Sequence, residues 1–396
     1  MTFLGAEGPV RFERHAIDAF PKGYQVAVAD VTGDGKPDVI ALSTDADRVD
    51  GYENPSWKRR AIAACPKGID VAPADFDRDG RVELAVASGF YFSESRRGGE
   101  IAILRFGPTA DEPWIPRTIA VDPVVHRLRW GDLDGDGRLE LIHAPIFGPG
   151  SDGARDPKPA HLWAFRPPAR PFEEPWERWT IDETLTVLHG IWVEDLDGDG
   201  RDEILAASFE GIHLFDLASE RRGSWSKTKI SEGAAPRVDA PGSPRGSSEV
   251  AVGRLAGGAR YIAAIEPWHG HEVAVYRPAA GRGAFGPGAP PWDRSVIDGT
   301  LVEGHALAVA DLDGDGTDEI VAGWRGGGGG LVLYDPKDAL ASSFERSTIE
   351  PGLPVEGLAA ADLDGDGRLD LVAIAGRKDA LVWLENVGPR PPTQGR

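Results

Sequence analysis

The sequence contains a single cysteine, Cys65, among its 396 residues. One thiol allows neither an internal disulfide nor a thiolate metal cluster, which excludes disulfide scaffolds and Cys-type zinc sites. Long hydrophobic runs are also missing: no stretch approaches 18 consecutive apolar residues, and no basic segment followed by an apolar run opens the chain. We therefore expect a soluble protein without an export signal and with a cytoplasmic location.

Basic residues are in the minority. Lysine and arginine number 43 against 64 aspartates and glutamates, which gives a formal net charge of −21 and argues against a nucleic-acid or anionic-membrane partner. Nucleophile triads, P-loops and Rossmann glycine motifs are absent, and the glycines of 326–330 form a flexible connection. Glycine and proline, by contrast, occur 51 and 32 times, and so many turn-forming residues predict many short strands.

An acidic loop recurs along the chain. Six copies share an Asp-x-Asp-x-Asp-Gly type core, with threonine at the third position of the first copy, and begin at Asp30, Asp75, Asp132, Asp195, Asp311 and Asp362. Between the fourth and fifth copies, residues 250–258 repeat the strand and the turn without the carboxylates. An apolar strand enters each loop, a second leaves it, and a third strand and an aromatic-bearing fourth segment follow. The sequence therefore contains seven repeat units.

The fourth segment is displaced in the order of the chain. One copy, Phe12-Glu13-Arg14, precedes the first unit, while the last unit ends after 380–386 without one. We predict an all-β fold, a seven-bladed β-propeller over residues 12–386 whose N-terminal strand closes the last blade. An open solenoid of seven hairpins is the competing architecture, and it would not need the displaced segment. Residues 1–11 are expected to be an N-terminal extension and 387–396 a disordered tail.

The acidic loops have the donor pattern of calcium sites. Side-chain oxygens at positions one, three and five, a carbonyl at seven and a carboxylate at nine surround one point with hard donors. The predicted ligands are Asp30, Thr32, Asp34, Lys36 and Asp38; Asp75, Asp77, Asp79, Arg81 and Glu83; Asp132, Asp134, Asp136, Arg138 and Glu140; Asp195, Asp197, Asp199, Arg201 and Glu203; Asp311, Asp313, Asp315, Thr317 and Glu319; and Asp362, Asp364, Asp366, Arg368 and Asp370. The alternative is that Asp-Gly turns merely cap hairpins. In the fifth unit Arg254 stands at the first position, where its guanidinium is expected to take the place of the cation.

On these six loops the chain resembles the FG-GAP or VCBS repeat family, the calcium-loop propellers related to the integrin α-subunit head. The resemblance covers residues 12–386 and implies the propeller fold with about six structural Ca²⁺ ions. It implies no function, because the same propeller serves adhesion, carbohydrate binding and catalysis. The function must come from residues that break the repeat.

One such break is a set of histidines. The residues six positions before each loop are Tyr24, Ile69, His126, His189, Ser248, His305 and Glu356, so three of the nine histidines occupy equivalent positions. At about 3.3 Å per residue, these positions lie roughly 20 Å from the acidic loops, on the opposite face of the ring. Equivalent positions surround the axis, so the three imidazoles are expected to converge.

The fifth unit adds histidines to the same face. Its segment 266–272 contains Trp268, His269 and His271 and joins the second strand to the third. Neutral imidazoles at this density suit a divalent metal such as Zn²⁺ or Mn²⁺, held by His126, His189 and His305, or a proton-transfer site. The predicted catalytic residues are His126, His189, His269, His271, His305, Arg325, Glu356 and Tyr24. The alternative is that each histidine lines a wet channel.

Aromatic side chains accompany the histidines. Trp268, Trp324 and Phe209 are predicted to bind substrate, because aromatic rings beside polar groups stack on sugars, and Arg325 is placed to hold a carboxylate or a hydroxyl pair. Capping of the hydrophobic interior between blades explains the same aromatics equally well.

These residues predict a metal-dependent carbohydrate lyase or dehydratase that performs β-elimination on a keto-sugar or a related sugar. In its histidines on a calcium-loop propeller, the chain resembles the propeller domain of the aldos-2-ulose dehydratase (1,5-anhydro-D-fructose dehydratase) family, which implies a substrate like 1,5-anhydrofructose. That family's cupin domains are missing from this sequence, and a polysaccharide lyase is a close variant. The alternative function is a non-catalytic, calcium-stabilised propeller that binds a glycan or a protein.

Overall fold

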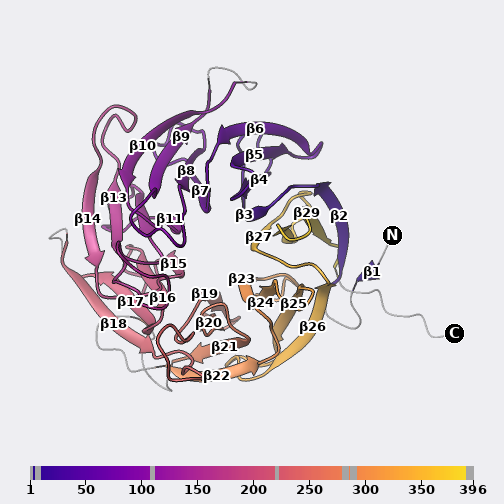
Figure 1. Cartoon of the computed structure of the whole chain (residues 1–396). Helices are drawn as coiled ribbons and strands as arrows, with labels where there is room; N and C mark the ends of the chain where they lie inside the picture. The colour runs from indigo at the N-terminus through magenta and orange to yellow at the C-terminus, as the bar shows by residue number, and fades with distance from the viewer. Residues whose placement is uncertain are drawn as a thin grey trace.

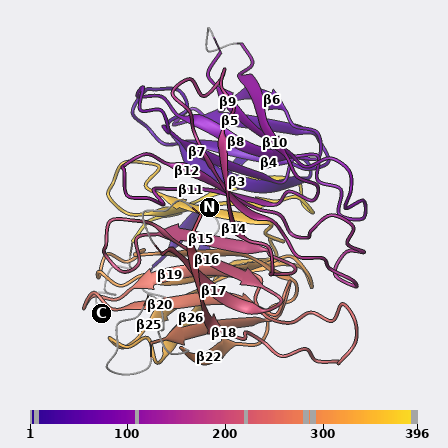
Figure 2. The ribbon, with the colours of Figure 1, turned by 90° about the vertical axis from the view of Figure 1, so that its left-hand side faces the viewer.

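The computed structural model describes residues 10–107, 112–218, 223–278, 285 and 292–388, and the backbone of residues 3–4. Within these ranges the regular structure consists of β-strands, and no helix is long and apolar enough to cross a membrane. Seven antiparallel sheets surround a common axis, which confirms the predicted seven-bladed β-propeller (Figure 1). Seen from the side, the strands run from one face of the ring to the other (Figure 2). Most of the predicted extension, 1–11, and tail, 387–396, lies outside the described residues.

Each blade is a four-stranded meander from the axis to the rim. The inner strands are β3 (Gly23–Ala29), β7 (Asp70–Ala74), β11 (Arg127–Gly131), β15 (Gly190–Glu194), β19 (Glu249–Arg254), β23 (Gly304–Ala310) and β27 (Gly357–Ala361). The second strands are β4 (Asp38–Ser43), β8 (Glu83–Ser88), β12 (Glu140–Ala144), β16 (Glu203–Ser208), β20 (Arg260–Glu266), β24 (Glu319–Trp324) and β28 (Asp370–Ala375). The third strands are β5 (Arg48–Glu53), β9 (Glu100–Arg105), β13 (Leu162–Arg166), β17 (Gly211–Leu217), β21 (Glu272–Arg277), β25 (Gly330–Pro336) and β29 (Ala380–Asn386). The outer strands are β6 (Lys58–Ala64), β10 (Ile115–Val121), β14 (Glu177–Asp182), β18 (Trp225–Ser231), β22 (Asp293–Asp298), β26 (Phe344–Pro351) and β2 (Phe12–Asp18).

The last blade takes its outer strand from the N-terminus. Strand β2 pairs antiparallel with β29, from Phe12 opposite Asn386 to Asp18 opposite Leu381. A short strand, β1 (Phe3–Leu4), adds a fifth strand to this sheet. The first and last blades also share one hydrophobic cluster, so the ring is closed and the open solenoid is wrong.

The hydrophobic core lies between the blades. All six residues of β8 are buried, whereas most of β10, at the rim, is half-buried or exposed. A strand packed on both faces needs a continuous apolar run, and the second and third strands have such runs. The rim strands alternate between apolar and polar residues because only one face is covered.

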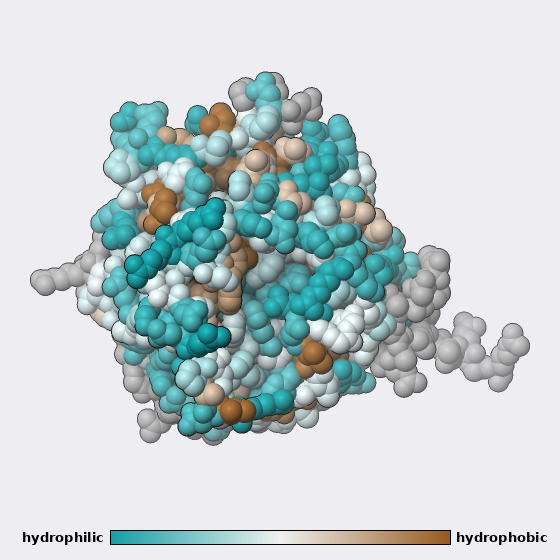
Figure 3. All heavy atoms as spheres, viewed as in Figure 1, coloured by the Kyte–Doolittle hydropathy of each residue, from teal (hydrophilic) through white to brown (hydrophobic). Residues whose placement is uncertain are grey.

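The two faces of the ring differ. The acidic loops join the inner to the second strands at one face. At the other, which we call the mouth face, the inner strands begin and the second strands connect to the third. Figure 3 looks along the axis and shows the face in view hollowed near its centre. Because the inner strands begin and the second strands end at the mouth face, side chains there are held by the ends of many paired strands.

Candidate functional site

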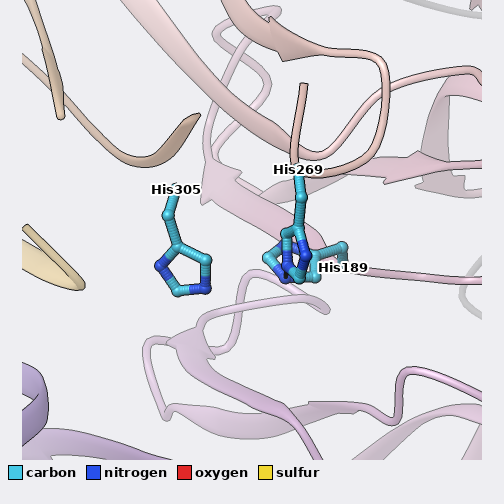
Figure 4. A group of neighbouring side chains, drawn as sticks. All are labelled: His189, His269 and His305. Atoms are coloured by element: carbon cyan, nitrogen blue, oxygen red, sulfur yellow. Dashed lines mark hydrogen bonds between the residues drawn. The ribbon is translucent and has the colours of Figure 1, made fainter. Parts of the chain in front are cut away.

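Four histidines meet at the mouth face. His126 and His189 immediately precede β11 and β15, and His305 lies near the start of β23; these residues are 1%, 1% and 2% exposed. His269 comes from the connection between β20 and β21, with a positive φ of 48°. Figure 4 shows His189, His269 and His305 pointing toward one another. The common register of the repeats brings the first three together, and a loop adds the fourth.

The four rings are in contact. The ring centroid of His189 lies 4.6 Å from that of His126 and 4.7 Å from that of His269, and the centroids of His269 and His305 are 5.2 Å apart. The hydroxyl of Tyr24 lies 3.1 Å from Nε2 of His305 and 3.5 Å from Nε2 of His126. The structure thus brings together Tyr24 and four of the five histidines predicted for this site.

Hydrogen bonds fix the protonated nitrogen of three rings. His126 donates from Nδ1 to the carbonyl oxygen of His189 at 3.1 Å, and His305 donates from Nδ1 to that of Glu356 at 2.6 Å. Nδ1 of His189 lies 2.9 Å from the carboxylate of Glu249. A carbonyl or a carboxylate accepts only from a protonated nitrogen, so each ring carries its proton on Nδ1 and presents the Nε2 lone pair to the site.

His269 has the opposite arrangement. The guanidinium of Arg325 lies 3.2 Å from its Nδ1 and can only donate, so the proton of this ring is on Nε2. Nε2 of His269 lies 2.9 Å from Nε2 of His189 and donates to it. Glu356 holds Arg325 in place through a 2.8 Å ion pair. His269 and Arg325 therefore form one hydrogen-bonded unit beside the other three imidazoles.

Two sets of three histidines are candidates to hold a metal ion. By distance alone, the ligand atoms of His189, His269 and His305 lie within 4.8 Å of one another. By hydrogen bonding, His126 replaces His269, because a metal-bound imidazole usually gives its other N–H to a carbonyl or a carboxylate. We favour His126, His189 and His305, since Nε2 of His269 carries a proton. Their donors fit a divalent transition metal.

Burial sets the charge state of the site. Loss of water around the rings lowers the pKa of all four histidines, and the charge of Arg127 lowers it further. The nearby carboxylate of Glu249 opposes this effect at His189, without reversing it. Burial also raises the pKa of Tyr24, which therefore stays a protonated donor. Neutral imidazoles can bind a metal or accept a proton at neutral pH.

The sequence reasoning missed a charged pair directly below the histidines. The side chain of Arg127 is 4% exposed, and its guanidinium lies 2.8 Å from Glu249. Burial alone would raise the pKa of Glu249, but Arg127 and the hydrogen bond from His189 hold it below its usual value. The pair lines a central cavity of about 420 Å³. Arg127 and Glu249 each follow directly on the position that holds histidine in three of the repeats. Two opposite charges at the start of apolar strands were the signal in the sequence that could have found this pair.

The fifth histidine, His271, lies apart from the other four, and its predicted catalytic role stays a prediction. Its Nε2 lies 2.5 Å from the guanidinium of Arg237, and the ring lines an outer pocket that His269 also lines. His269 and His271 are two residues apart in a turn, and there the backbone directs them to different places.

The three predicted aromatics have different surroundings. Trp268 is half-buried and stacks on His269, with ring centroids 4.5 Å apart. Phe209 is 3% exposed and lies behind Trp268, so it packs against the site and does not face it. Trp324 lies over Gly330, where a Cβ would collide with the indole, and belongs to the core between two blades. Trp268 alone of the three lies beside the imidazoles.

The acidic loops share one conformation. In the loop that begins at Asp311, its carboxylate accepts the amides of Gly314 at 2.8 Å and Gly316 at 3.0 Å. Glu319, the ninth residue, is fully buried and accepts the amide of Leu312 with one oxygen. Its other oxygen has no hydrogen-bond partner among the described residues, and the same holds for one oxygen each of Glu83, Glu140 and Glu203.

These orphaned oxygens fit a cation. Burial, with neighbouring aspartates adding to it, raises the pKa of Glu319 to about 9 and the pKa of Glu83 to about 8. Several carboxylates around one buried oxygen repel one another unless a positive charge lies between them. The donor set contains oxygen only, which is the preference of Ca²⁺.

Two arginines modify this pattern. The guanidinium of Arg166, from β13, contacts Asp134 and Asp136 in the third loop, where it would compete with a cation. Arg254 was expected to replace the cation of the fifth unit. Its side chain is instead 65% exposed and pairs with Glu194 of the preceding blade, so that expectation is wrong.

Comparison with known proteins agrees with both expected resemblances. Residues 98–279 match the family model described as aldos-2-ulose dehydratase, beta-propeller domain, and residues 30–86 and 311–373 match the FG-GAP-like repeat model. Aldos-2-ulose dehydratase of Phanerodontia chrysosporium is 29% identical in an alignment 246 positions long, which covers 58% of this chain and 26% of the relative. The chain thus spans about a quarter of that relative's length. The predicted resemblances to both families are confirmed.

Solved structures share the fold at low sequence identity. BBS1N in complex with ARL6DN has a TM-score of 0.57 at 16% identity, covering 99% of this chain and 98% of that one. An Agrocybe aegerita lectin that recognises non-reducing terminal N-acetylglucosamine has a TM-score of 0.52 at 14% identity, covering 84% and 81%. Rhamnogalacturonan lyase YesW has a TM-score of 0.50 at 15% identity, covering 98% and 74%. At such identities these similarities establish the propeller fold alone.

Proposed function

We propose that this propeller is a metal-dependent carbohydrate lyase or dehydratase that performs β-elimination on a keto-sugar resembling 1,5-anhydrofructose. The observation that carries the proposal is the group of four contacting, neutral imidazoles, three buried and one half-buried; in the three buried ones Nδ1 is hydrogen-bonded, which leaves the lone pair on Nε2. The match to the propeller domain of aldos-2-ulose dehydratase supports a carbohydrate as the substrate. The metal would be Zn²⁺ or Mn²⁺.

We assign the metal ligands to His126, His189 and His305. An ion held there would polarise the carbonyl oxygen of the sugar and make the neighbouring C–H bond more acidic. The hydroxyl of Tyr24 donates to Nε2 of His305. If a metal ion used that Nε2 lone pair, the hydroxyl would be free to donate to a sugar oxygen. Glu249 holds the ring of His189 and keeps its proton on Nδ1.

We assign proton transfer to His269. Arg325 donates a hydrogen bond to Nδ1 of His269. When a sugar hydroxyl accepts that hydrogen bond in its place, the lone pair on Nδ1 becomes free and the ring can act as a base. Nδ1 then accepts the proton from the α-carbon, and the electron pair forms the double bond as the β-hydroxyl departs. The same proton passes to the departing hydroxyl, so that water leaves and His269 returns to its neutral state.

Metal content and turnover test the proposal together. After dialysis against calcium-containing buffer, we expect about one tightly held transition metal per chain and an enone absorbance from 1,5-anhydrofructose. The double variant His189→Ala/His305→Ala should lose both the metal and at least about 10³-fold of the rate. His15→Ala, which disrupts a second candidate metal group of Glu13, His15 and Glu385 at the rim, is the control and should change neither. If the fully metallated protein forms no product from any keto-sugar, the proposed elimination reaction is wrong.

Glu249 allows a finer test of the metal set. Glu249→Gln keeps the shape of the side chain but loses the charge that orients His189. We expect transition-metal affinity to fall by about 10- to 100-fold, as for other partners of metal-bound histidines. Competition with a chromophoric chelator measures that affinity, and an unchanged value would argue against His189 as a ligand.

We further propose that the six acidic loops bind structural Ca²⁺. A buried oxygen of the ninth residue that lacks a hydrogen-bond partner among the described residues supports this at four loops, of which the third has the Arg166 guanidinium 3.7 Å from that oxygen. The shared Asp-amide geometry supports calcium at the other two. The third loop should bind most weakly, because Arg166 competes there.

A non-catalytic glycan-binding propeller is the second candidate. The stacking of Trp268 on the edge of the site is the observation that favours it. Calcium alone after dialysis, with sugar binding but no turnover, would establish this function in place of the first.

A further inference from the structure

The rim of the mouth face is built unevenly. Most connections there are short, such as 122–126 and 299–303, but three are long: 89–99, 145–161 and 232–248. These long connections contact one another. Ser95 donates to the carbonyl oxygen of Ser151 at 2.7 Å, and a Cβ on Gly242 would lie 2.8 Å from the backbone of Arg155. Together they raise one side of the rim beside the histidines.

Of the three long connections, 232–248 joins one blade to the next. It forms one wall of a pocket of about 550 Å³. The facing walls come from the loop that carries Trp268, His269 and His271 and from residues 299–303. His269 lines this pocket and also lies 2.9 Å from His189, so the pocket adjoins the histidine site. A volume of this size lies within the range of small-molecule sites.

The walls of this pocket combine apolar and polar groups. Val238 and Val302 are 64% and 48% exposed, and they are two of only seven large hydrophobic residues so exposed in the described part of the chain. Trp268 lines the pocket too, and its indole Nε1 is buried without a hydrogen-bond partner among the described residues. Arg237 and His271 supply hydrogen-bonding groups at the edge. Exposed apolar groups gathered in a hollow mark a binding groove.

We propose that this pocket is a second sugar subsite, and that the substrate is therefore a disaccharide or a glycoside with two rings. The inference rests on the proposed function for the first ring, which lies at the imidazoles. The second ring lies against Trp268, between Val238 and Val302, with its hydroxyls toward Arg237 and His271. A sugar ring has apolar C–H faces and a polar edge, and the pocket offers matching surfaces.

Titration calorimetry on the full chain tests the subsite without requiring turnover. The probes are cellobiose, maltose, lactose, xylobiose and chitobiose, each compared with its own monosaccharides. We expect at least one disaccharide to bind at least 10-fold more tightly than its monosaccharides. Val302→Trp fills the pocket and should abolish that preference. Val121→Trp, at a valine 65% exposed on β10, is the matched control and should keep it.

Two results would overturn the subsite: no disaccharide preference in the unmodified chain, or a preference that survives Val302→Trp. If Val302→Trp does not fold, Val238→Trp fills the same pocket from the opposite loop, and the disaccharide preference is measured with that variant instead. The outcome is separable from that of the proposed reaction. A wrong reaction leaves the disaccharide preference without turnover, and a wrong subsite leaves turnover of a single-ring keto-sugar without the preference.

Discussion

Chelation with EGTA lowers the thermal unfolding midpoint by at least about 10 °C, if the acidic loops hold calcium as proposed. One calcium site contributes about 2.7 kcal/mol to the free energy of unfolding when the free Ca²⁺ concentration is 100 times its dissociation constant. The total free energy of unfolding of a folded domain is only about 5–15 kcal/mol. The reason is local: without an ion, the buried carboxylate of Glu319 faces other carboxylates with one oxygen unsatisfied. Calorimetry with and without added Ca²⁺ measures the shift.

Loop variants locate the effect. Asp313→Asn removes one proposed ligand and should release about one calcium ion per chain with a drop of a few degrees. Asp152→Asn changes an exposed aspartate outside the acidic loops and should have neither effect. A midpoint unmoved by EGTA would show that the loops are only hairpin turns, and full restoration by Mg²⁺ would contradict a specific preference for calcium.

Phe12→Ala costs about 3–5 kcal/mol of unfolding free energy, the range for a buried phenylalanine. Phe12 is 3% exposed and packs in a cluster with residues of the last two blades, such as Leu333 and Leu384. The change leaves a cavity where the N-terminal strand joins the C-terminal sheet. Denaturant titration measures the loss, and β2 should become the first strand to exchange its amide hydrogens.

The control for Phe12 lies in the same strand. Ala16 is exposed, so Ala16→Ser should change stability by less than about 0.5 kcal/mol. A loss below about 1 kcal/mol for Phe12→Ala would mean that closure of the last blade contributes little to the stability of the ring.

The repeat made the fold predictable from sequence. Six acidic loops at matching distances define the register of every inner strand, and that register placed His126, His189 and His305 at one level of the ring. The displaced Phe12 segment predicted closure for the same reason. A repeat constrains many residues at once, so each position is inferred from its equivalents and not from local propensity.

The rest of the site lies outside the repeat. The separate position of His271 could not be predicted because the turn after Glu266 has no equivalent in other blades, and its direction depends on the contact with Arg237. The proton positions of the imidazoles depend on carbonyls and carboxylates of neighbouring blades. The outer pocket depends on 232–248, a connection without repeat character whose shape is set by its tertiary contacts.

The seventh blade also imposes an order on synthesis. Strand β2 is made before the other strands of the ring, but its partner β29 ends at Asn386, so β2 cannot pair with β29 until the rest of the ring has been translated. An unpaired strand with a buried phenylalanine can pair wrongly with other chains in the meantime. The blades between β2 and β29 must therefore form before β2 reaches its place in the last blade.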